Sequence, residues 1–186
     1  MCTNYKIFKR IGDTMVIIQK DNLLIREIKA SDIELIRSWR NRSDIKKNFI
    51  DTDTISESQQ QLWYKNYLMK PDDIMFIIEE KNIFKSAIGT AALYNIKTKE
   101  QTVEFGRLIV GHMPAQRKGF GKQATMLVCK YAFDVLKSKQ INLTVLHDNI
   151  KAIQLYLKIG FIITNTTFDV VHMSLNKNFF LNSSSV

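Results

Sequence analysis

The fold is decided by residues 103–122, which read VEFGRLIV, then GHMPA, then QRKGFGK. The first part predicts a strand over Thr102–Val110, and the last part opens a helical pattern that begins at Phe120. Between them lies a loop with two glycines and two cations. Glycine lets a backbone approach a ligand closely, and a helix N-terminus presents unpaired N–H groups and a partial positive charge. We therefore expect this loop to hold a diphosphate.

Several readings compete for the loop. A P-loop would need Gly at position 116 and Ser or Thr at position 123, where this chain has Gln116 and Gln123. A dinucleotide fingerprint fits G-x-G-x-x-A from Gly119 to Ala124, but the glycine does not follow its strand directly, and no acid ends the next strand before Asp148. These departures disfavour both sites, while a plain structural turn shaped by the two glycines stays open.

A third ligand fits the loop better. The pattern Q-x-x-G-x-G over Gln116–Gly121 is similar to the signature with which the GNAT N-acetyltransferase superfamily holds the pyrophosphate of coenzyme A. A second motif, N-x-x-A-x-x-x-Y-x-x-x-G-F, runs from Asn149 to Phe161 and includes Tyr156. The two motifs in this order, each in a strand–helix context, make the chain resemble this superfamily over residues 23–176.

Shorter segments resemble particular branches of the superfamily. Leu24-Ile25-Arg26 and Glu104-Phe105-Gly106 look most like the RimJ/RimL branch. Trp39-Arg40-Asn41 and Gln61-Leu62-Trp63 are similar to bacterial acetyltransferases that act on amino-sugar nucleotides. This second resemblance implies a primary amine on such a nucleotide as the acetyl acceptor. A polyamine, a peptide N-terminus and, as a different class, a non-catalytic coenzyme A-binding regulatory domain stay open as alternatives.

The resemblance implies a mixed α/β fold of the GNAT type. Its central sheet would be mixed but mostly antiparallel, with six to seven strands, a splay between the fourth and the fifth, and helices on both faces. We expect residues 1–22 to form an N-terminal extension, residues 23–178 the acetyltransferase domain and residues 179–186 a C-terminal tail. The patterns of the chain predict strands over Leu23–Ile28, Ile74–Glu80, Ala87–Tyr94, Thr102–Val110, Ile141–Leu146, Phe161–Ile163 and Val170–Leu175.

Helices are expected at four places. Ser31 and Asp32 offer N-caps to a first helix, and a second one starts near Ser56. An apolar stripe from Phe120 to residue 136 predicts the third helix. The fourth covers Ile150–Ile159 and would be closed by Gly160 in the left-handed conformation. A β-like run at Met15–Ile18 has no role that the sequence reveals.

The resemblance also assigns coenzyme-binding residues. The loop would hold the pyrophosphate, and backbone groups of the splayed strand would bind the pantetheine arm of acetyl-coenzyme A. We expect positive φ at Gly121, so that a Gly121→Val substitution would block the coenzyme. The residues concerned are Leu108, Ile109, Val110, Gln116, Arg117, Lys118, Gly119, Phe120, Gly121, Lys122, Asn149 and Tyr156.

Direct attack of an amine on the thioester needs no protein nucleophile, and a backbone N–H at Leu108 or Ile109 would stabilise the oxyanion. The resemblance implies that Tyr156 protonates the departing thiolate, and an ordinary tyrosine pKa of about 10 keeps it protonated at neutral pH. Core packing is the alternative role for Tyr156.

Glu104 is the candidate general base, although a carboxylate needs a raised pKa or a water chain to act on an ammonium. Its alternative is an ion pair with Arg107 or a lysine, and His147 is the rival base.

Arg40, Asn41 and Trp63 are the candidate acceptor-binding residues, with core packing as the alternative for each and the favoured one for the tryptophan. The chain has 27 Lys and Arg against 18 Asp and Glu, a net charge of +9, which favours an anionic small-molecule ligand over a nucleic acid when the lysines are spread thinly.

The two cysteines form no disulfide framework or metal cluster, and Cys129 in a helical stripe argues against an acyl-cysteine route. No apolar run is long enough to span a bilayer, and no signal-peptide pattern begins the sequence. We therefore expect a cytoplasmic protein without a metal or membrane partner, and a homodimer stays open.

Overall fold

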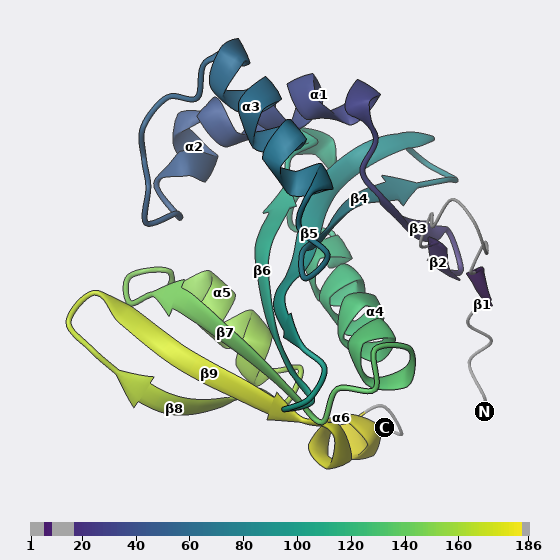
Figure 1. Ribbon diagram of the computed structural model, residues 1–186, viewed down its shortest axis with the longest axis vertical. Coiled ribbons are helices and arrows are strands. Elements are labelled where there is room, and N and C mark those ends of the chain that lie inside the picture. The colour runs from purple at the N-terminus through teal and green to yellow at the C-terminus, as the bar shows by residue number, and fades with distance from the viewer. Residues whose placement is uncertain (1–5, 9–16, 184–186) are drawn as a thin grey trace.

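The computed structural model of the protein describes residues 6–8 and 17–183, and the structural statements below concern these residues (Figure 1). Nine strands form one sheet in the order β1-β2-β3-β4-β5-β6-β7-β9-β8. The strands are β1 (Lys6–Phe8), β2 (Ile17–Lys20), β3 (Leu23–Glu27), β4 (Ile74–Glu80), β5 (Ser86–Lys97), β6 (Thr102–Val110), β7 (Gln140–Leu146), β8 (Ile162–Thr166) and β9 (Val170–Asn176). The helices are α1 (Ile33–Asn41), α2 (Ser43–Lys46), α3 (Glu57–Leu68), α4 (Phe120–Asp134), α5 (Ile150–Leu157) and α6 (Lys177–Ser183), with 3-10 segments η1 (Ala30–Asp32) and η2 (Met113–Ala115).

The predicted splay lies between β6 and β7. These strands are parallel and pair only where Thr102–Glu104 faces Gln140–Asn142, while every other neighbouring pair in the sheet is antiparallel. Beyond Glu104 the two strands diverge: β6 continues toward α1–α3, and β7, β9 and β8 fan out to the lower left (Figure 1). The mixed, mostly antiparallel α/β fold and its splay between the fourth and fifth predicted strands are thus confirmed. The predicted number of six to seven strands was wrong, because β1 and β2 pair onto the edge of the sheet beside β3.

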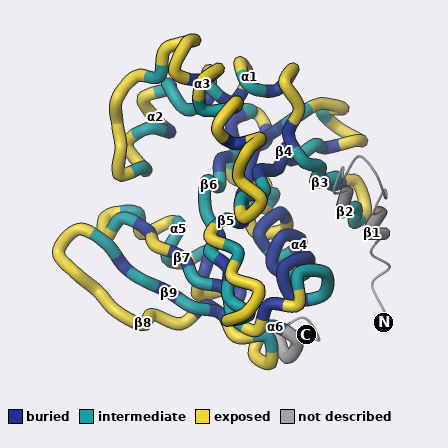
Figure 2. Tube along the Cα trace, viewed as in Figure 1, coloured by how far each residue is buried: buried dark blue, intermediate teal, exposed yellow. Residues whose placement is uncertain are grey.

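Helices cover both faces of the sheet because the buried strands alternate between two cores. On β4, Phe76 and Ile78 pack with α4 in the larger core, whereas Met75 and Ile77 pack with α1 and α3 in the smaller one. Figure 2 shows the result: α4 is largely buried, and the outer edge strand β8 is exposed along its length. Among the described helices, none combines the length and apolar character that crossing a bilayer requires.

Several local predictions are confirmed. Ser56 forms a capping box with Gln59, whose amide donates to the Ser56 hydroxyl (3.2 Å) while its side-chain oxygen accepts from the Ser56 amide (2.8 Å). Gly160 has φ of +110° just after α5. The sheet continues into β2, within the residues assigned to an extension, while Met15 and Val16 of the β-like run lie outside the described residues. Helices α2 and α6 were not predicted.

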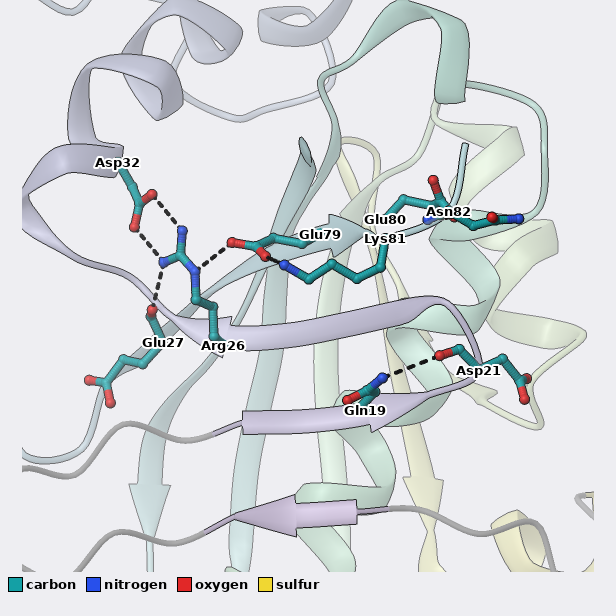
Figure 3. Close-up of polar contacts among 9 residues, drawn as sticks. All are labelled: Gln19, Asp21, Arg26, Glu27, Asp32, Glu79, Glu80, Lys81 and Asn82. Atoms are coloured by element: carbon teal, nitrogen blue, oxygen red, sulfur yellow. Dashed lines mark hydrogen bonds and ion pairs between the residues drawn. The ribbon is translucent and has the colours of Figure 1, made fainter. Parts of the chain in front are cut away.

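The prediction that the Asp32 side chain caps the first helix was wrong. Asp32 immediately precedes α1, but its carboxylate makes no cap bond to that helix. It accepts instead from the Lys29 amide (2.7 Å) and, through both oxygens, from the Arg26 guanidinium (2.7 and 2.8 Å). Arg26 also donates to Glu79 on β4 (2.7 Å), so one cation ties β3, β4 and η1 together (Figure 3).

These contacts set the pKa values of both partners. The hydrogen bonds that Arg26 donates to Asp32 raise the pKa of Arg26 further above its already high value, and this outweighs the lowering by burial. Burial alone would raise the pKa of Asp32, but the bonds from Arg26 and Lys29 lower it overall. Both groups are therefore charged at neutral pH and satisfied by each other.

Candidate active site

The splayed edge of β6 starts at a β-bulge. Arg107 has φ of +51°, the β5–β6 register shifts between Thr90 and Ala92, and the Thr90 hydroxyl donates to the Arg107 carbonyl (2.9 Å). A left-handed non-glycine residue costs energy and persists only where its surroundings hold it. Here Arg107 donates two hydrogen bonds to Asp73 (2.7 and 2.9 Å) and lies over the Tyr94 ring at 4.8 Å.

Beyond this bulge lie the predicted pantetheine and oxyanion residues Leu108, Ile109 and Val110. None of them pairs with β7 in the described structure. Ile109 points to the smaller core, and Leu108 and Val110 pack against the larger one. The main chain of this segment therefore has an open edge toward the wedge between β6 and β7. Nothing in the local sequence signals the bulge, because Arg107 is an ordinary strand residue by type.

The N-terminus of α4 fits a phosphate ligand. Gly119 has φ of +83° and is the N-cap of this 15-residue helix. The Gln123 amide donates to the Gly119 carbonyl (3.1 Å) as the first bond of the helix, so the amides of Phe120, Gly121 and Lys122 have no acceptor within it. A Cβ added to Gly119 would meet only the side-chain Nε2 of Gln123, at 3.9 Å. The space in front of the helix end is open.

The prediction of positive φ at Gly121 was wrong. The left-handed glycine is Gly119, because the residue before the helix makes the turn. A Cβ at Gly121 would lie 3.5 Å from Leu155 and 3.7 Å from Val110, which are ordinary packing distances. A Cβ at Gly121 would therefore point between β6 and α5.

The remaining loop residues divide into two kinds. Gln116 donates from Nε2 to the Val110 carbonyl (3.0 Å) and so ties the loop to the end of β6. Arg117, Lys118 and Lys122 are exposed cations around the α4 N-terminus. This arrangement supplies free amides and positive charge at one point, which suits a pyrophosphate.

Tyr156 is both a core residue and an unpaired acid. It is 7% exposed, and its ring contacts Phe105 and Phe161 with centroid separations of 6.0 and 5.7 Å. Burial, and after it Cys129 and Tyr94, raises the pKa of its phenol above the ordinary value. The structure shows no hydrogen bond from its hydroxyl to a described residue. The Tyr156 phenol is thus protonated at neutral pH, and its O–H can donate to a ligand.

The other motif residues have defined contacts. Asn149 caps α5, accepting at Oδ1 from the Ala152 amide (3.3 Å). Glu104 accepts from the Asn95 side chain (2.9 Å), whereas the Arg107 that we considered as its ion-pair partner binds Asp73. The His147 side chain is half exposed, with Nδ1 3.5 Å from an oxygen of Asp148. Neither base candidate forms a hydrogen bond to Tyr156 in the described structure.

A cavity of about 430 Å³ adjoins the same stretch of β6, since Arg107 and Ile109 line it together with residues of α1, α3 and the segment between α2 and α3. Arg40 forms one wall, with its guanidinium 3.7 Å from the centre of the Phe49 ring. Its Nη2 donates to the Asp51 carbonyl (3.3 Å), but its Nη1 is buried and has no hydrogen-bond partner among the described residues. Burial lowers the pKa of Arg40, and the nearby Asp51 only partly offsets this.

The structure brings two of the three predicted acceptor residues to this cavity, Arg40 and Trp63. Asn41 does not line it, because its side chain donates to the Ile55 carbonyl and accepts from the Ile55 amide, both at 2.8 Å. Sequence reasoning missed Gln60, a buried residue of the cavity wall. Its spacing was the available signal, since positions 60, 63 and 67 lie on one face of a helix.

Comparisons with known proteins agree with this geometry. The sequence profile of the acetyltransferase (GNAT) domain family matches residues 22–162. The chain is 30% identical to Acetyltransferase PseH of Campylobacter jejuni over 152 residues, which cover 82% of this chain and 90% of that protein. It is 25% identical to the Spermidine N(1)-acetyltransferase of Vibrio cholerae, over 75% of this chain and 79% of that enzyme. A crystal structure of the Vibrio cholerae spermidine N-acetyltransferase with CoA and spermine superposes with a TM-score of 0.77, at 24% identity and over 87% of this chain and 99% of that one.

Proposed function

Because the chain belongs to the GNAT family of N-acetyltransferases, we propose that it transfers the acetyl group of acetyl-coenzyme A to the primary amine of a small anionic acceptor, an amino-sugar nucleotide. The transfer would be direct, within a ternary complex. A non-catalytic role is disfavoured, since the curated relatives named above are acetyltransferases.

The coenzyme would be held by the groups described above. Its pyrophosphate would lie at Gly119 and the amides of Phe120–Lys122, with Arg117 and Lys118 beside it. The pantetheine arm would follow the open edge of β6 at Leu108–Val110 into the wedge. Asn149 and Gln116 would act indirectly, by fixing α5 and the loop.

In the proposed reaction the amine nitrogen bonds to the thioester carbonyl carbon, and the C–S bond then breaks. A backbone N–H of Leu108 or Ile109 would stabilise the oxyanion in between. The proton lost by the amine would pass to Glu104, directly or through water, and Tyr156 would donate to the leaving sulfur. An ordinary tyrosine pKa, about 10, already exceeds that of a thiol, about 8.5, and burial raises the Tyr156 pKa further. Tyr156 would therefore stabilise the departing thiolate by a hydrogen bond more readily than by complete transfer of its proton.

The observation that supports an anionic acceptor is the Arg40 guanidinium. It belongs to a half-buried residue on a cavity beside the splayed strand, and its buried Nη1 has no partner among the described residues. A planar guanidinium binds a phosphate through parallel hydrogen bonds, and a bound anion would offset the cost of burying it. Phe49 and Trp63 add flat apolar surface to the same cavity.

One observation favours a polyamine as the second candidate. Asp51 and Asp53 lie on the exposed rim of the cavity, where a cationic chain could bind. The RimJ/RimL-type segments would also be compatible with a peptide N-terminus. The cytoplasmic location and the homodimer stay predictions.

A thiol-release assay over an amine panel tests the proposal. We expect turnover with an amino-sugar nucleotide and little with spermidine or a peptide. Arg40→Ala should raise the acceptor KM about 30-fold, the scale of a lost charge-assisted hydrogen bond, with the coenzyme KM unchanged. Arg37→Ala is the matched control, because Arg37 lies on the same helix but is paired with Glu34. Efficient acetylation of spermidine alone, with no loss in Arg40→Ala, would overturn the anionic acceptor.

A further inference from the structure

Two buried side-chain atoms lack a hydrogen-bond partner in the described part of the chain, and the residues of both line the acceptor cavity. They are Nη1 of Arg40 on α1 and Nε2 of Gln60 on α3. Each is a donor, and they come from different helices. The anionic acceptor proposed above accounts for Arg40 but leaves Gln60 without an explanation.

Gln60 differs from the glutamines on either side of it. Gln59 is exposed and accepts from the Ser56 amide through its side chain (2.8 Å), and Gln61 is exposed and donates to Glu57 (3.1 Å). Gln60 is only 4% exposed, and its side-chain Nε2 makes no hydrogen bond to any described residue. A buried amide without a partner weakens a fold, so packing gives no reason for a glutamine at this position.

Two cavities border the unpaired side-chain amide of Gln60. The smaller one, of about 260 Å³ between α1 and α3, is lined by charged groups that already have partners, since Glu34 pairs with Arg37 and Glu57 accepts from Gln61. In the larger cavity, the Arg107 guanidinium is bound to Asp73. The buried donors still available to a ligand there are those of Arg40 and Gln60.

We propose that Gln60 is a specificity-determining residue that donates from Nε2 to a neutral oxygen of the acceptor, next to the anionic group bound by Arg40. This rests on the proposed function. A carbonyl or hydroxyl oxygen satisfies such a donor, whereas a protonated polyamine offers only N–H donors and leaves both Gln60 and Arg40 unpaired. Sites that hydrogen-bond a substrate reject analogues that lack the bonding atom, because their own polar groups then stay unpaired.

Gln60→Leu tests the proposal, since it keeps the approximate size and removes the amide. We expect the acceptor KM to rise about tenfold and the coenzyme KM to stay unchanged, while the melting temperature of the free enzyme is kept or rises because a buried unpaired group is gone. Gln61→Leu, one residue away and exposed, should change neither KM. A lower melting temperature with an unchanged acceptor KM would show that Gln60 is structural and overturn the proposal.

The oxygen could belong to the nucleobase or to the sugar, and two acceptors separate these sources. If Gln60→Leu raises the KM for the amino-sugar nucleotide but not for the corresponding amino-sugar 1-phosphate, the contact is to the base; if it raises both, the contact is to the sugar. An increase for neither overturns the proposal. Failure of the proposed function looks different, because the wild-type enzyme would then turn over none of the anionic acceptors.

Discussion

Arg26 and Arg40 are both half-buried, and they differ in what they bind. Arg26 donates to Asp32, Glu79 and the Glu27 carbonyl, and its pKa is raised. Arg40 has one long bond to a carbonyl and one buried donor without a partner among the described residues, and its pKa is lowered. The first arginine is part of the framework. The second stacks on the Phe49 ring and keeps a buried donor that a ligand in the cavity could use.

Two tyrosines repeat the contrast. Tyr67 is 5% exposed, and its hydroxyl donates to Glu27 (2.8 Å) and accepts from the Met75 amide (3.3 Å). Tyr156 is buried to a similar degree, but its hydroxyl makes no hydrogen bond to a described residue. Native proteins satisfy nearly all buried polar groups, so the unsatisfied ones concentrate where ligands bind. In the described part of this molecule the buried side-chain atoms without a partner are Nη1 of Arg40 and Nε2 of Gln60, which line the cavity beside the opened end of β6.

The largest expected effect separates the two tyrosines. Tyr156→Phe should lower kcat about 10²-fold, the usual scale for a lost general acid, and leave the melting temperature unchanged. Tyr67→Phe should do the reverse: stability falls by about 2 kcal/mol, since Glu27 and the Met75 amide lose their partner, and kcat is kept. Steady-state kinetics and thermal unfolding of both variants check this. Wild-type kcat in Tyr156→Phe would make that residue part of the core alone.

Asp32→Asn tests the framework side. Breaking this largely buried ion pair leaves Glu79 as the only carboxylate bound to Arg26. We expect a loss of about 2 kcal/mol in the free energy of unfolding, lower than for a fully buried pair. Both KM values should stay unchanged, because the contact lies at the junction of β3, β4 and η1. Urea unfolding measures the loss, and a change in acceptor KM without a loss of stability would remove the distinction between the two regions.

A smaller effect is expected at the helix end. Gly119→Ala places a side chain in the left-handed region and on the open side of the loop, and should raise the coenzyme KM about tenfold. Gly160→Ala, at φ of +110°, is the matched control that should lower stability without changing coenzyme binding. Isothermal titration with coenzyme A distinguishes them. Equal coenzyme affinity in both variants would exclude Gly119 as part of the cradle.

The smallest effect is the pH dependence of the framework. The pKa of Asp32 is lowered in the fold, so its stabilisation is present above the ordinary carboxyl pKa, about 4, and is lost as pH falls through the lowered value. The wild-type melting temperature should therefore fall more steeply than that of Asp32→Asn as the pH drops below about 4. Parallel curves would mean that the ion pair contributes no pH-dependent stability.

Much of the framework could be predicted from the sequence because its signals are local. The capping box at Ser56, the left-handed Gly160 and the strand over Thr102–Val110 all depend on residues within a few positions of one another. The wrong prediction at the N-terminus of α4 also concerns neighbouring residues. The sequence pattern marks two glycines, but only the turn geometry shows that Gly119 is left-handed and that a Cβ at Gly121 would point inward.

The sequence by itself determined the family and the positions of the coenzyme motifs, because those depend on spacing along one strand and the following helix. Only the tertiary structure decided which polar groups stay unpaired. Arg40 and Asn41 are neighbours on α1, but their side chains differ in their partners. The Asn41 side chain donates to the Ile55 carbonyl and accepts from the Ile55 amide, whereas Nη1 of Arg40 has no partner among the described residues. Whether a side chain is satisfied depends on partners many positions away, such as Asp73 for Arg107, and no local pattern encodes those.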